Sequence, residues 1–147
     1  MRTVALDLGT RRIGVAVSDA GGIMATPYST IQRSGDMSLD RARVAEVVAE
    51  VEAGLVVVGL PLSLDGGQGP AARAALREAE ALRTVLDVPV ECHDERLTSV
   101  TANRSLTEAG VTGRRRQKAR KAGAVDQAAA AVLLQSWLDT RTSGGPG

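Results

Sequence analysis

The sequence predicts a single α/β domain in which a mixed β-sheet is flanked by helices. In the second half of the chain, short apolar segments of strand length alternate with segments of helical periodicity, as they do where helices cross over between parallel strands. Aromatic residues make up only 1% of a chain that is 44% hydrophobic, so the core must be built from Val, Leu, Ile and Ala. A length of 147 residues is enough for one domain that is stable without disulfides.

The N-terminal part of the chain predicts three strands. Thr3–Leu8 and Ile13–Ser18 are nearly continuous apolar segments, and the turn-prone Gly9-Thr10-Arg11-Arg12 separates them. These two segments are therefore expected to form a hairpin. A third extended segment is expected from about Met24 to Ile31, because it follows the Gly21-Gly22 turn.

The middle of the chain predicts two helices and two further strands. Apolar residues at helical spacing predict an amphipathic helix over Ser38–Ala53, closed by Gly54. The segment Leu55–Leu60 is uniformly apolar, as is typical of a central parallel strand. After a Gly-rich loop, Pro70 is well placed to begin a helix that ends near Leu86. A strand from Pro89 to about His93 completes this part.

The C-terminal part predicts two helices with a basic segment between them. Helices are expected over Thr98–Ala109 and from Ala124 to about Thr140, and the second is apolar on most sides and should pack on the sheet. One domain would thus span residues 1–140, and the Gly- and Pro-rich tail 141–147 is expected to be disordered. The basic segment holds six of the 18 Lys and Arg residues and no acid, which leaves the rest of the chain near −5. Such a concentration is typical of a solvated loop or of a phosphate-binding patch. Its members are Arg114, Arg115, Arg116, Lys118, Arg120 and Lys121.

The cysteine content and the hydropathy favour a cytoplasmic protein. Cys92 is the single cysteine, so no internal disulfide can form. The N-terminus lacks the features of a signal peptide, and no apolar segment reaches the roughly 18 residues needed to span a membrane.

Three acids are expected near the ends of strands or helices. Asp7 interrupts an apolar strand, where an unpaired charge is costly, so a partner is implied; hydrogen bonds from its own turn are the plainer explanation. Glu95 follows the last strand, and ligands collect at the carboxyl ends of strands, although an acid here could simply pair with Arg96. Asp126 opens the predicted last helix, where the helix dipole alone favours an acid.

Carboxylates that converge without cysteine or lysine partners suit Mg²⁺ or Mn²⁺. In phosphoryl transfer, two such ions about 3.5 to 4 Å apart activate the attacking water and stabilise the leaving oxygen. Zinc is disfavoured because only Cys92 and His93 could bind it, and adjacent strand residues point to opposite faces. The three acids therefore predict a two-ion nuclease site, with His93 in a structural or auxiliary role.

The same residues fall in motifs that resemble the YqgF family, also called RuvX. Its members are named as nucleases of pre-16S rRNA or as Holliday junction resolvases. The similarity extends from Thr3 to Asp139. It rests on four motifs that occur in order: Ala5-Leu6-Asp7-Leu8-Gly9-Thr10 with Ile13-Gly14-Val15-Ala16, then Val57-Val58-Gly59-Leu60-Pro61-Leu62 with Asp65-Gly66, then Asp94-Glu95-Arg96-Leu97-Thr98, and Val125-Asp126 with Ala129-Ala130 and Leu133-Leu134-Gln135.

The resemblance implies an RNase H-like fold with a mixed five-stranded sheet and a metal site formed by Asp7, Glu95 and Asp126. The motif leaves open whether Asp94 or Glu95 supplies the second ligand, and strand alternation leads us to choose Glu95. The implied activity is hydrolysis of phosphodiester bonds, with the 5′ end of pre-16S rRNA on ribosomal particles as the expected substrate. The nucleic-acid backbone is expected to contact Arg11, Arg96 and the basic segment, and Gly59-Leu60-Pro61 should border the groove.

Three alternatives remain open. The same acids could serve a Holliday junction resolvase, which cuts two strands symmetrically and should be a homodimer rather than a monomer. Asp7-Leu8-Gly9-Thr10 also resembles the first phosphate loop of the actin, hexokinase and Hsp70 ATPases, but those proteins need two such domains. The chain could instead be a non-catalytic RNA-binding factor of ribosome assembly. Tyr28 and Trp137 are the only Phe, Tyr or Trp residues, so few side chains can stack on unstacked bases. Sequence-specific recognition of such bases is therefore expected to be poor.

Overall fold

The computed structural model describes residues 1–61, 69–94 and 118–144. Five strands of this part form one sheet, in the order β3-β2-β1-β4-β5. β1 pairs with β2 in antiparallel and with β4 in parallel orientation, while β2–β3 is antiparallel and β4–β5 is parallel. The expected hairpin and mixed sheet are therefore confirmed. The strands are β1 (Arg2–Leu8), β2 (Arg12–Ser18), β3 (Ala25–Gln32), β4 (Ala53–Leu60) and β5 (Val90–Asp94).

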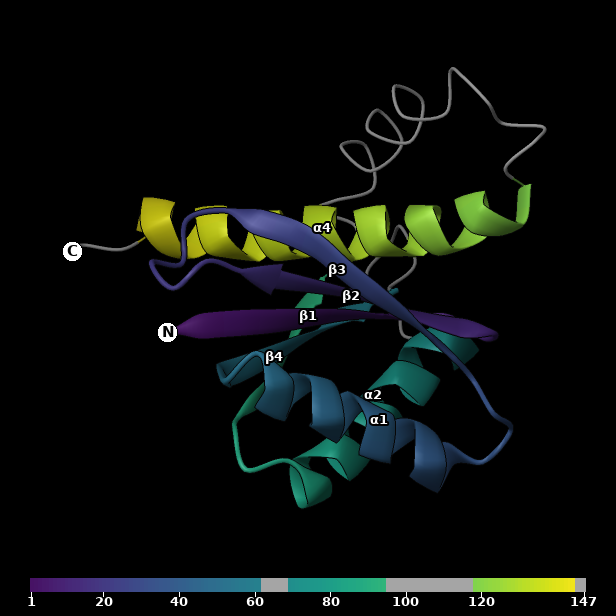
Figure 1. Ribbon diagram of the computed structural model, residues 1–147. Coiled ribbons are helices and arrows are strands. Elements are labelled where there is room, and N and C mark those ends of the chain that lie inside the picture. Colours follow the sequence, from purple (N-terminus) through teal and green to yellow (C-terminus); the bar gives the residue numbers. More distant parts are fainter. Residues whose placement is uncertain (62–68, 95–117, 145–147) are drawn as a thin grey trace.

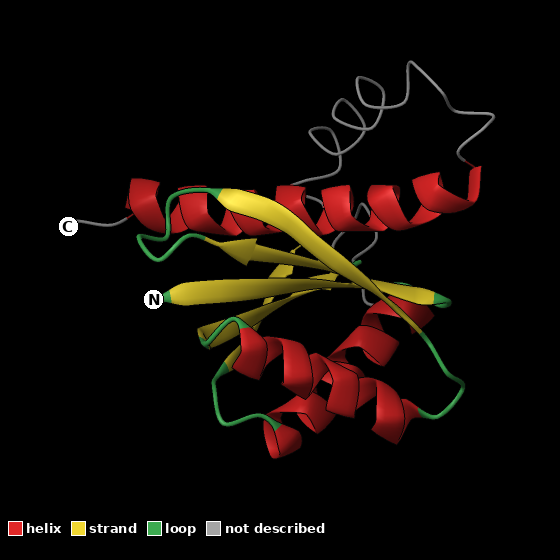
Figure 2. Cartoon of the chain, in the orientation of Figure 1, coloured by secondary structure: helices red, strands yellow, loops and turns green. Residues whose placement is uncertain are grey.

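Helices cover both faces of the sheet (Figure 1). α1 (Met37–Glu50) and α2 (Pro70–Val85) lie on one face, and the long helix α4 (Lys118–Gly144) crosses the other. Figure 2 shows the same three layers, helix, sheet and helix. None of the helices in the described ranges is both long and apolar enough to span a membrane.

Two apolar cores lie on either side of the sheet. The core towards α1 and α2 contains bulky aliphatic side chains such as Leu6, Val58 and Leu82. The core towards α4 uses small strand residues, Ala5 and Ala16, against Leu133, Leu134 and Trp137 of the helix. Residues of β1 and β4 belong to both cores, which is why these strands are nearly continuous apolar segments.

Polar side chains fix α4 along the sheet. Gln135 accepts a hydrogen bond from the backbone N–H of Ala25 at 2.9 Å and donates one to the carbonyl of Ile23 at 2.9 Å. One side chain thus satisfies two backbone groups next to the β2–β3 turn, the N–H of Ala25 and the carbonyl of Ile23. The position of α4 relative to β2 and β3 is therefore defined at its C-terminal half, which in turn defines where its N-terminal half lies.

The end of α1 differs from the expectation. The helix ends at Glu50, and the left-handed conformation that reverses the chain belongs to Glu52, with φ of 55°, rather than to Gly54. Gly54 lies inside β4, where the side chain of Met1 fills the space that a Cβ would take. The glycine therefore serves packing of the N-terminus and does not cap the helix.

α4 is longer than expected at both ends. It begins at Lys118 rather than Ala124, so part of the basic segment is helical, and it ends at Gly144 rather than near Thr140. Residues 141–144, which were expected in the tail, belong to this helix, and the guanidinium carbon of Arg141 lies 4.6 Å from the centroid of the Trp137 ring. Residues 145–147 and the helix expected over 98–109 lie outside the described part.

The buried carboxylate of Asp40 predicts a pH-dependent stability. It accepts hydrogen bonds from the backbone N–H of Ser34 at 3.0 Å and from its hydroxyl at 2.9 Å. The Ser34 N–H is the largest cause that holds the pKa of Asp40 below its usual value, and burial opposes it. A lowered folded-state pKa stabilises the protein above the unfolded-state pKa, and this contribution is lost as the pH falls below about 4.

Asp40→Asn is therefore expected to lower the free energy of unfolding by about 1 kcal/mol at pH 7, since a charged acceptor binds more strongly than a neutral one. The difference from wild type should shrink as the pH falls from 4 towards 2. Urea denaturation at several pH values measures it, with Glu46→Gln on the exposed face of α1 as the matched control. A difference that is constant over pH would contradict the assignment.

Candidate functional site

Asp7 lies near the carboxyl end of β1, on the face of the sheet that α4 covers. Ala5, two residues earlier on the same face, packs in the α4 core. The cross-strand partner of Asp7 is Gly14 of β2, and on the other side Gly59 follows Val58, the partner of Leu6. The half-buried carboxylate therefore stands between two positions without side chains, where backbone from the covering layer can approach the sheet closely.

Asp126 is brought over the same part of the sheet. A Cβ built on Gly14 would lie 2.5 Å from the carbonyl carbon of Asp126 and 3.1 Å from its Cβ, so the backbone of α4 rests directly on the glycine. The next residue, Gln127, donates a hydrogen bond at 3.0 Å to the hydroxyl of Thr30, which is the partner of Gly14 on β3. The backbone of Asp126 thus lies over the strand position next to Asp7, at the end of the sheet where the β1–β2 turn begins, and the place of these two acids is called the acidic corner below.

The start of α4 also removes the simplest explanation for Asp126. An acid is favoured by the helix dipole only within the first turn of a helix. Because α4 begins at Lys118, Asp126 lies about two turns inside the helix. The helix dipole therefore does not account for Asp126, whereas a cationic partner would.

Arg12 belongs to this site although the sequence analysis did not select it. Its Nε donates a hydrogen bond at 2.6 Å to Oδ2 of Asp126, and the two side chains keep 30% and 23% of their surface exposed. The available signal was its position two residues before Gly14, which puts both on the same face of β2. From the sequence alone, Arg12 is grouped with the turn-prone residues before it.

The β1–β2 turn that joins Asp7 to Arg12 is held from the opposite side by Arg33. Gly9 donates its N–H to the carbonyl of Arg12 at 3.0 Å, and a Cβ on Gly9 would lie 2.6 Å from that oxygen. Arg33 donates from Nε to the carbonyl of Gly9 at 2.6 Å and pairs through both terminal nitrogens with Glu78 of α2 at 3.1 and 3.2 Å. The turn is therefore fixed to α2.

His93 and its neighbours on β5 divide between the two faces. His93 lies within 3.1 Å of the Ser136 hydroxyl of α4, and burial lowers the pKa of the imidazole while the Asp94 carboxylate opposes that effect. Cys92 packs in the opposite core, so the two side chains cannot share a zinc ion. By alternation Asp94 follows Cys92, away from the face of Asp7. Through its hydrogen bond to Ser136, His93 links β5 to α4, which fits the structural role expected for it.

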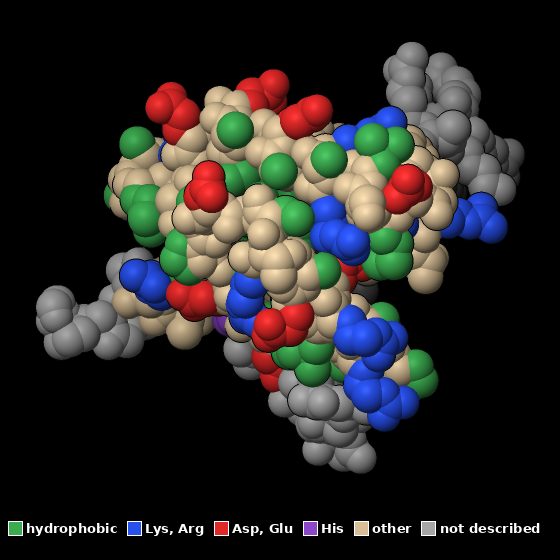
Figure 3. Space-filling view, turned by 90° about the horizontal axis from the view of Figure 1, so that it is seen from below, with side chains coloured by type: hydrophobic (Ala, Val, Ile, Leu, Met, Phe, Trp, Pro, Cys, Tyr) green, Lys and Arg blue, Asp and Glu red, His purple; other side chains and the backbone are tan. Residues whose placement is uncertain are grey.

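The predicted basic residues are only partly within the described ranges. Arg11 is exposed on the β1–β2 turn, and the backbones of Lys118, Arg120 and Lys121 form the first turns of α4, ahead of Asp126. Seen from the α1 and α2 side, Lys and Arg side chains are interspersed with acids (Figure 3). The residues Glu95, Arg96, Arg114, Arg115 and Arg116 lie outside the described part.

The donors that can be assessed fit a hard divalent cation. Asp7 and Asp126 offer carboxylate oxygens at the acidic corner, and Cys92, the single thiol of the chain, lies on the other face of the sheet. Among the described side chains no three His, Cys, Asp or Glu residues converge, so these two acids alone do not complete a metal site. A cation held by these two acids would need further oxygen donors.

Comparisons with known proteins identify the family and the fold. The model of a family described as "RuvX: Holliday junction resolvase" matches residues 1–140. A protein of Mycobacterium sp. (strain KMS) named "Putative pre-16S rRNA nuclease" is 49% identical over 141 residues, which are 95% of this chain and 80% of that protein. A protein of the same name from Myxococcus xanthus is 47% identical over 139 residues, 95% of this chain and 88% of that protein.

Solved structures show the same fold at low identity. RuvC of T. thermophilus, in complex with a Holliday junction substrate, has a TM-score of 0.59 at 16% identity, covering 97% of this chain and 96% of that chain. The yeast mitochondrial Holliday junction resolvase Ydc2 has a TM-score of 0.57 at 10% identity, covering 95% and 78%. The fold is therefore RNase H-like, as expected.

Proposed function

This chain belongs to the RuvX family, and from that membership we propose that it is a divalent-metal-dependent nuclease that processes the 5′ end of pre-16S rRNA. Relatives that are 47–49% identical over nearly the whole chain carry the corresponding name. The observation that carries the proposal is the contact of Asp126 with Gly14, the cross-strand partner of Asp7. Since processing of ribosomal RNA takes place in the cytoplasm, the proposal also locates the protein there.

We assign the cation ligands to Asp7, Glu95 and Asp126. Asp7 and Asp126 are supported by their places at the acidic corner, where the backbone of Asp126 lies over the cross-strand partner of Asp7. Glu95 is supported by alternation, because it follows His93 on the α4 side of β5 by two residues. When bound, Mg²⁺ or Mn²⁺ would stabilise the charge that develops on the phosphate and favour deprotonation of the attacking water.

The other residues of the site would bind and orient the phosphate backbone. Arg12 partly neutralises Asp126 and carries a guanidinium whose remaining donors suit phosphate oxygens. Lys121 and Lys118 lie about 7 and 12 Å ahead of Asp126 along the axis of α4, so backbone phosphates that leave the cut site along the helix would meet positive charge. Arg11, Arg96 and the three consecutive arginines 114–116 would extend this contact surface.

A Holliday junction resolvase is the second candidate. It is favoured by the description of the matching family. A resolvase must present two sites to one junction and should therefore be a symmetric dimer. A non-catalytic RNA-binding factor is the third, and it predicts tight RNA binding without cleavage by any preparation.

One assay separates these candidates. A 5′-extended 16S precursor RNA and a four-way DNA junction are offered side by side, with Mg²⁺, with Mn²⁺ and with EDTA. We expect cleavage of the RNA only when a cation is present, with 5′-phosphate and 3′-hydroxyl products. Cleavage of the junction alone would overturn the proposal in favour of the resolvase, and binding without cleavage would support the non-catalytic factor.

The Arg12–Asp126 ion pair gives a prediction on cation affinity. In the absence of cation the guanidinium occupies Oδ2 of Asp126, so a cation that binds this oxygen must displace it. Arg12→Gln is therefore expected to strengthen Mn²⁺ binding several-fold in isothermal titration calorimetry. Because the pair is partly exposed, the free energy of unfolding should fall by less than about 1 kcal/mol. Weaker Mn²⁺ binding by the variant would mean that Arg12 supports the cation site rather than competing with it.

A further inference from the structure

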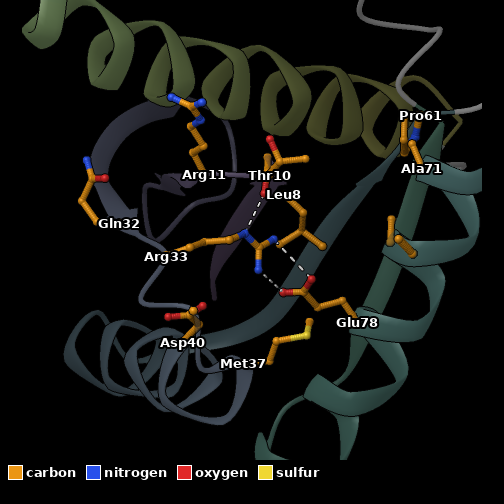
Figure 4. A pocket seen from close by; sticks show the side chains of 14 residues that line it. Leu8, Thr10, Arg11, Gln32, Arg33, Met37, Asp40, Pro61, Ala71 and Glu78 are labelled. Carbon is orange, nitrogen blue, oxygen red and sulfur yellow. Dashed lines mark hydrogen bonds and ion pairs between the residues drawn. The ribbon is translucent and has the colours of Figure 1, made fainter.

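A pocket of about 660 Å³ lies on the other side of the β1–β2 turn from the acidic corner. Its walls come from the end of β1, the turn, the end of β3 and the first turns of α1 and α2 (Figure 4). Leu8, which directly follows Asp7, lines the pocket, and so do Gly9, Thr10 and Arg11. The pocket and the acidic corner therefore share the turn as a common wall.

Some polar side chains of the pocket are already hydrogen-bonded within the protein, and others are exposed to a ligand. The two acids are already satisfied, since Glu78 pairs with Arg33 and Asp40 accepts from Ser34. Arg11 and Gln32 lie at the rim with their polar ends exposed (Figure 4). Much of the remaining wall consists of small or apolar side chains, as ligand pockets generally do.

Arg33 lies in the middle of this pocket (Figure 4) and is held as a fixed plane. Its Nε donates to the Gly9 carbonyl and its two terminal nitrogens to the two oxygens of Glu78. All three contacts use N–H groups along the edges of the guanidinium and leave its flat face free of them. Guanidinium planes are platforms on which unstacked bases stack.

The aromatic composition makes this platform important. The chain contains one Trp, one Tyr and no Phe. Trp137 is buried in the α4 core, and Tyr28 bonds to Glu50 outside the residues that line this pocket. A base that enters this pocket therefore meets no aromatic ring among its described lining residues, and Arg33 is the guanidinium whose plane is held on three sides there.

We propose that this pocket holds one unstacked nucleobase of the substrate strand, next to the phosphate that is cut, with the base lying on the guanidinium of Arg33. The strand would cross the β1–β2 turn, so that its phosphate meets the acidic corner and the neighbouring base enters the pocket. Gln32 would face the base edge, and Arg11 the backbone. The inference rests on the proposed function and goes beyond it, because it requires the substrate to be unpaired at this nucleotide.

The test uses RNA binding without cleavage. A short RNA that spans the wild-type cut site is prepared intact and with a single abasic ribonucleotide at each position within three nucleotides of the cut. Affinities are measured in EDTA by fluorescence anisotropy. For wild type, loss of one particular base is expected to weaken binding roughly tenfold, as stacking on a single platform does, while the other positions change little.

Ala74→Leu tests the pocket itself. Ala74 is an exposed residue of α2 that lines the pocket, so the larger side chain fills the space without entering the core. The variant should bind the intact RNA as weakly as wild type binds the sensitive abasic RNA, and the abasic substitution should then have no further effect. Ala49→Leu, on an exposed position of α1 outside the pocket, is the control and should behave as wild type. Arg33→Lys, which keeps the charge and loses the plane, should lose the same discrimination.

The inference is overturned if every abasic RNA binds wild type as tightly as the intact RNA does, or if Ala74→Leu still discriminates between them. Either result leaves the proposed function in place when wild type cleaves the intact RNA with Mg²⁺. A wild-type protein that neither binds nor cleaves this RNA would overturn both.

Discussion

Asp7→Asn is expected to lower the rate of RNA cleavage about a thousandfold while the protein stays folded. Asp7 is the strand acid of the corner that Asp126 overhangs, and a cation ligand contributes several kcal/mol of charge stabilisation in the transition state. Each 1.36 kcal/mol corresponds to a factor of ten in rate. Asn keeps the shape of the side chain, so the melting temperature should change by only a few degrees. Single-turnover cleavage with saturating Mg²⁺ and thermal denaturation are the two measurements.

The matched control is Asp139→Asn. Asp139 is an exposed acid of the same helix α4 and accepts a hydrogen bond from Gln135, near the other end of the sheet. Its substitution should leave cleavage within about twofold of wild type. If Asp7→Asn cleaved as fast as this control after repeated purification, the activity would belong to another site or to a contaminant.

Gly14→Ala has the second large expected effect, and it acts through the backbone. The added methyl group would be 2.5 Å from the carbonyl carbon of Asp126, which is far inside contact distance, and helix backbone cannot move aside cheaply. Overpacking of this kind costs about 2 to 3 kcal/mol, or roughly 5 to 10 °C in melting temperature. α4 would be displaced from the sheet, and Asp126 with it.

Cleavage should fall together with stability in this variant. A displacement of about 1 Å at a reacting group can cost roughly a hundredfold in rate, so we expect at least that loss at a temperature where the variant is fully folded. Gly69→Ala is the control, because a Cβ there meets none of the described residues within 4 Å. A Gly14→Ala protein with the stability and the rate of wild type would show that α4 does not rest on this residue.

Most of the sheet and two of the three described helices could be predicted from local pattern. β1 and β4 are buried on both faces, and this produces the continuous apolar segments that predicted them. Pro70 begins α2 as its position predicted. The helix boundaries are less predictable. Gly54 was expected to close α1 and lies in β4, where Met1 packs against it, and α4 begins at Lys118 rather than at Ala124.

The acids of the candidate site could be selected from the sequence, and the arginines that contact Asp126 and the β1–β2 turn could not. Asp7 could be selected because a carboxylate in an apolar strand needs a partner. Arg12 could not, since its ion pair joins residues that only the packing of α4 on β2 brings together. The same holds for Arg33, whose contacts link β3 to the β1–β2 turn and to α2. Such long-range contacts leave no periodic trace in the sequence.

The central claim is that Asp7, Glu95 and Asp126 bind divalent cations together. Isothermal titration calorimetry with Mn²⁺ on wild type and on Asp7→Asn, Glu95→Gln and Asp126→Asn tests it most directly, with Asp94→Asn as the control on the other face of β5. We predict that each of the three variants loses most of the Mn²⁺ affinity and that Asp94→Asn retains it. Wild-type Mn²⁺ affinity in any of the three variants would contradict the claim.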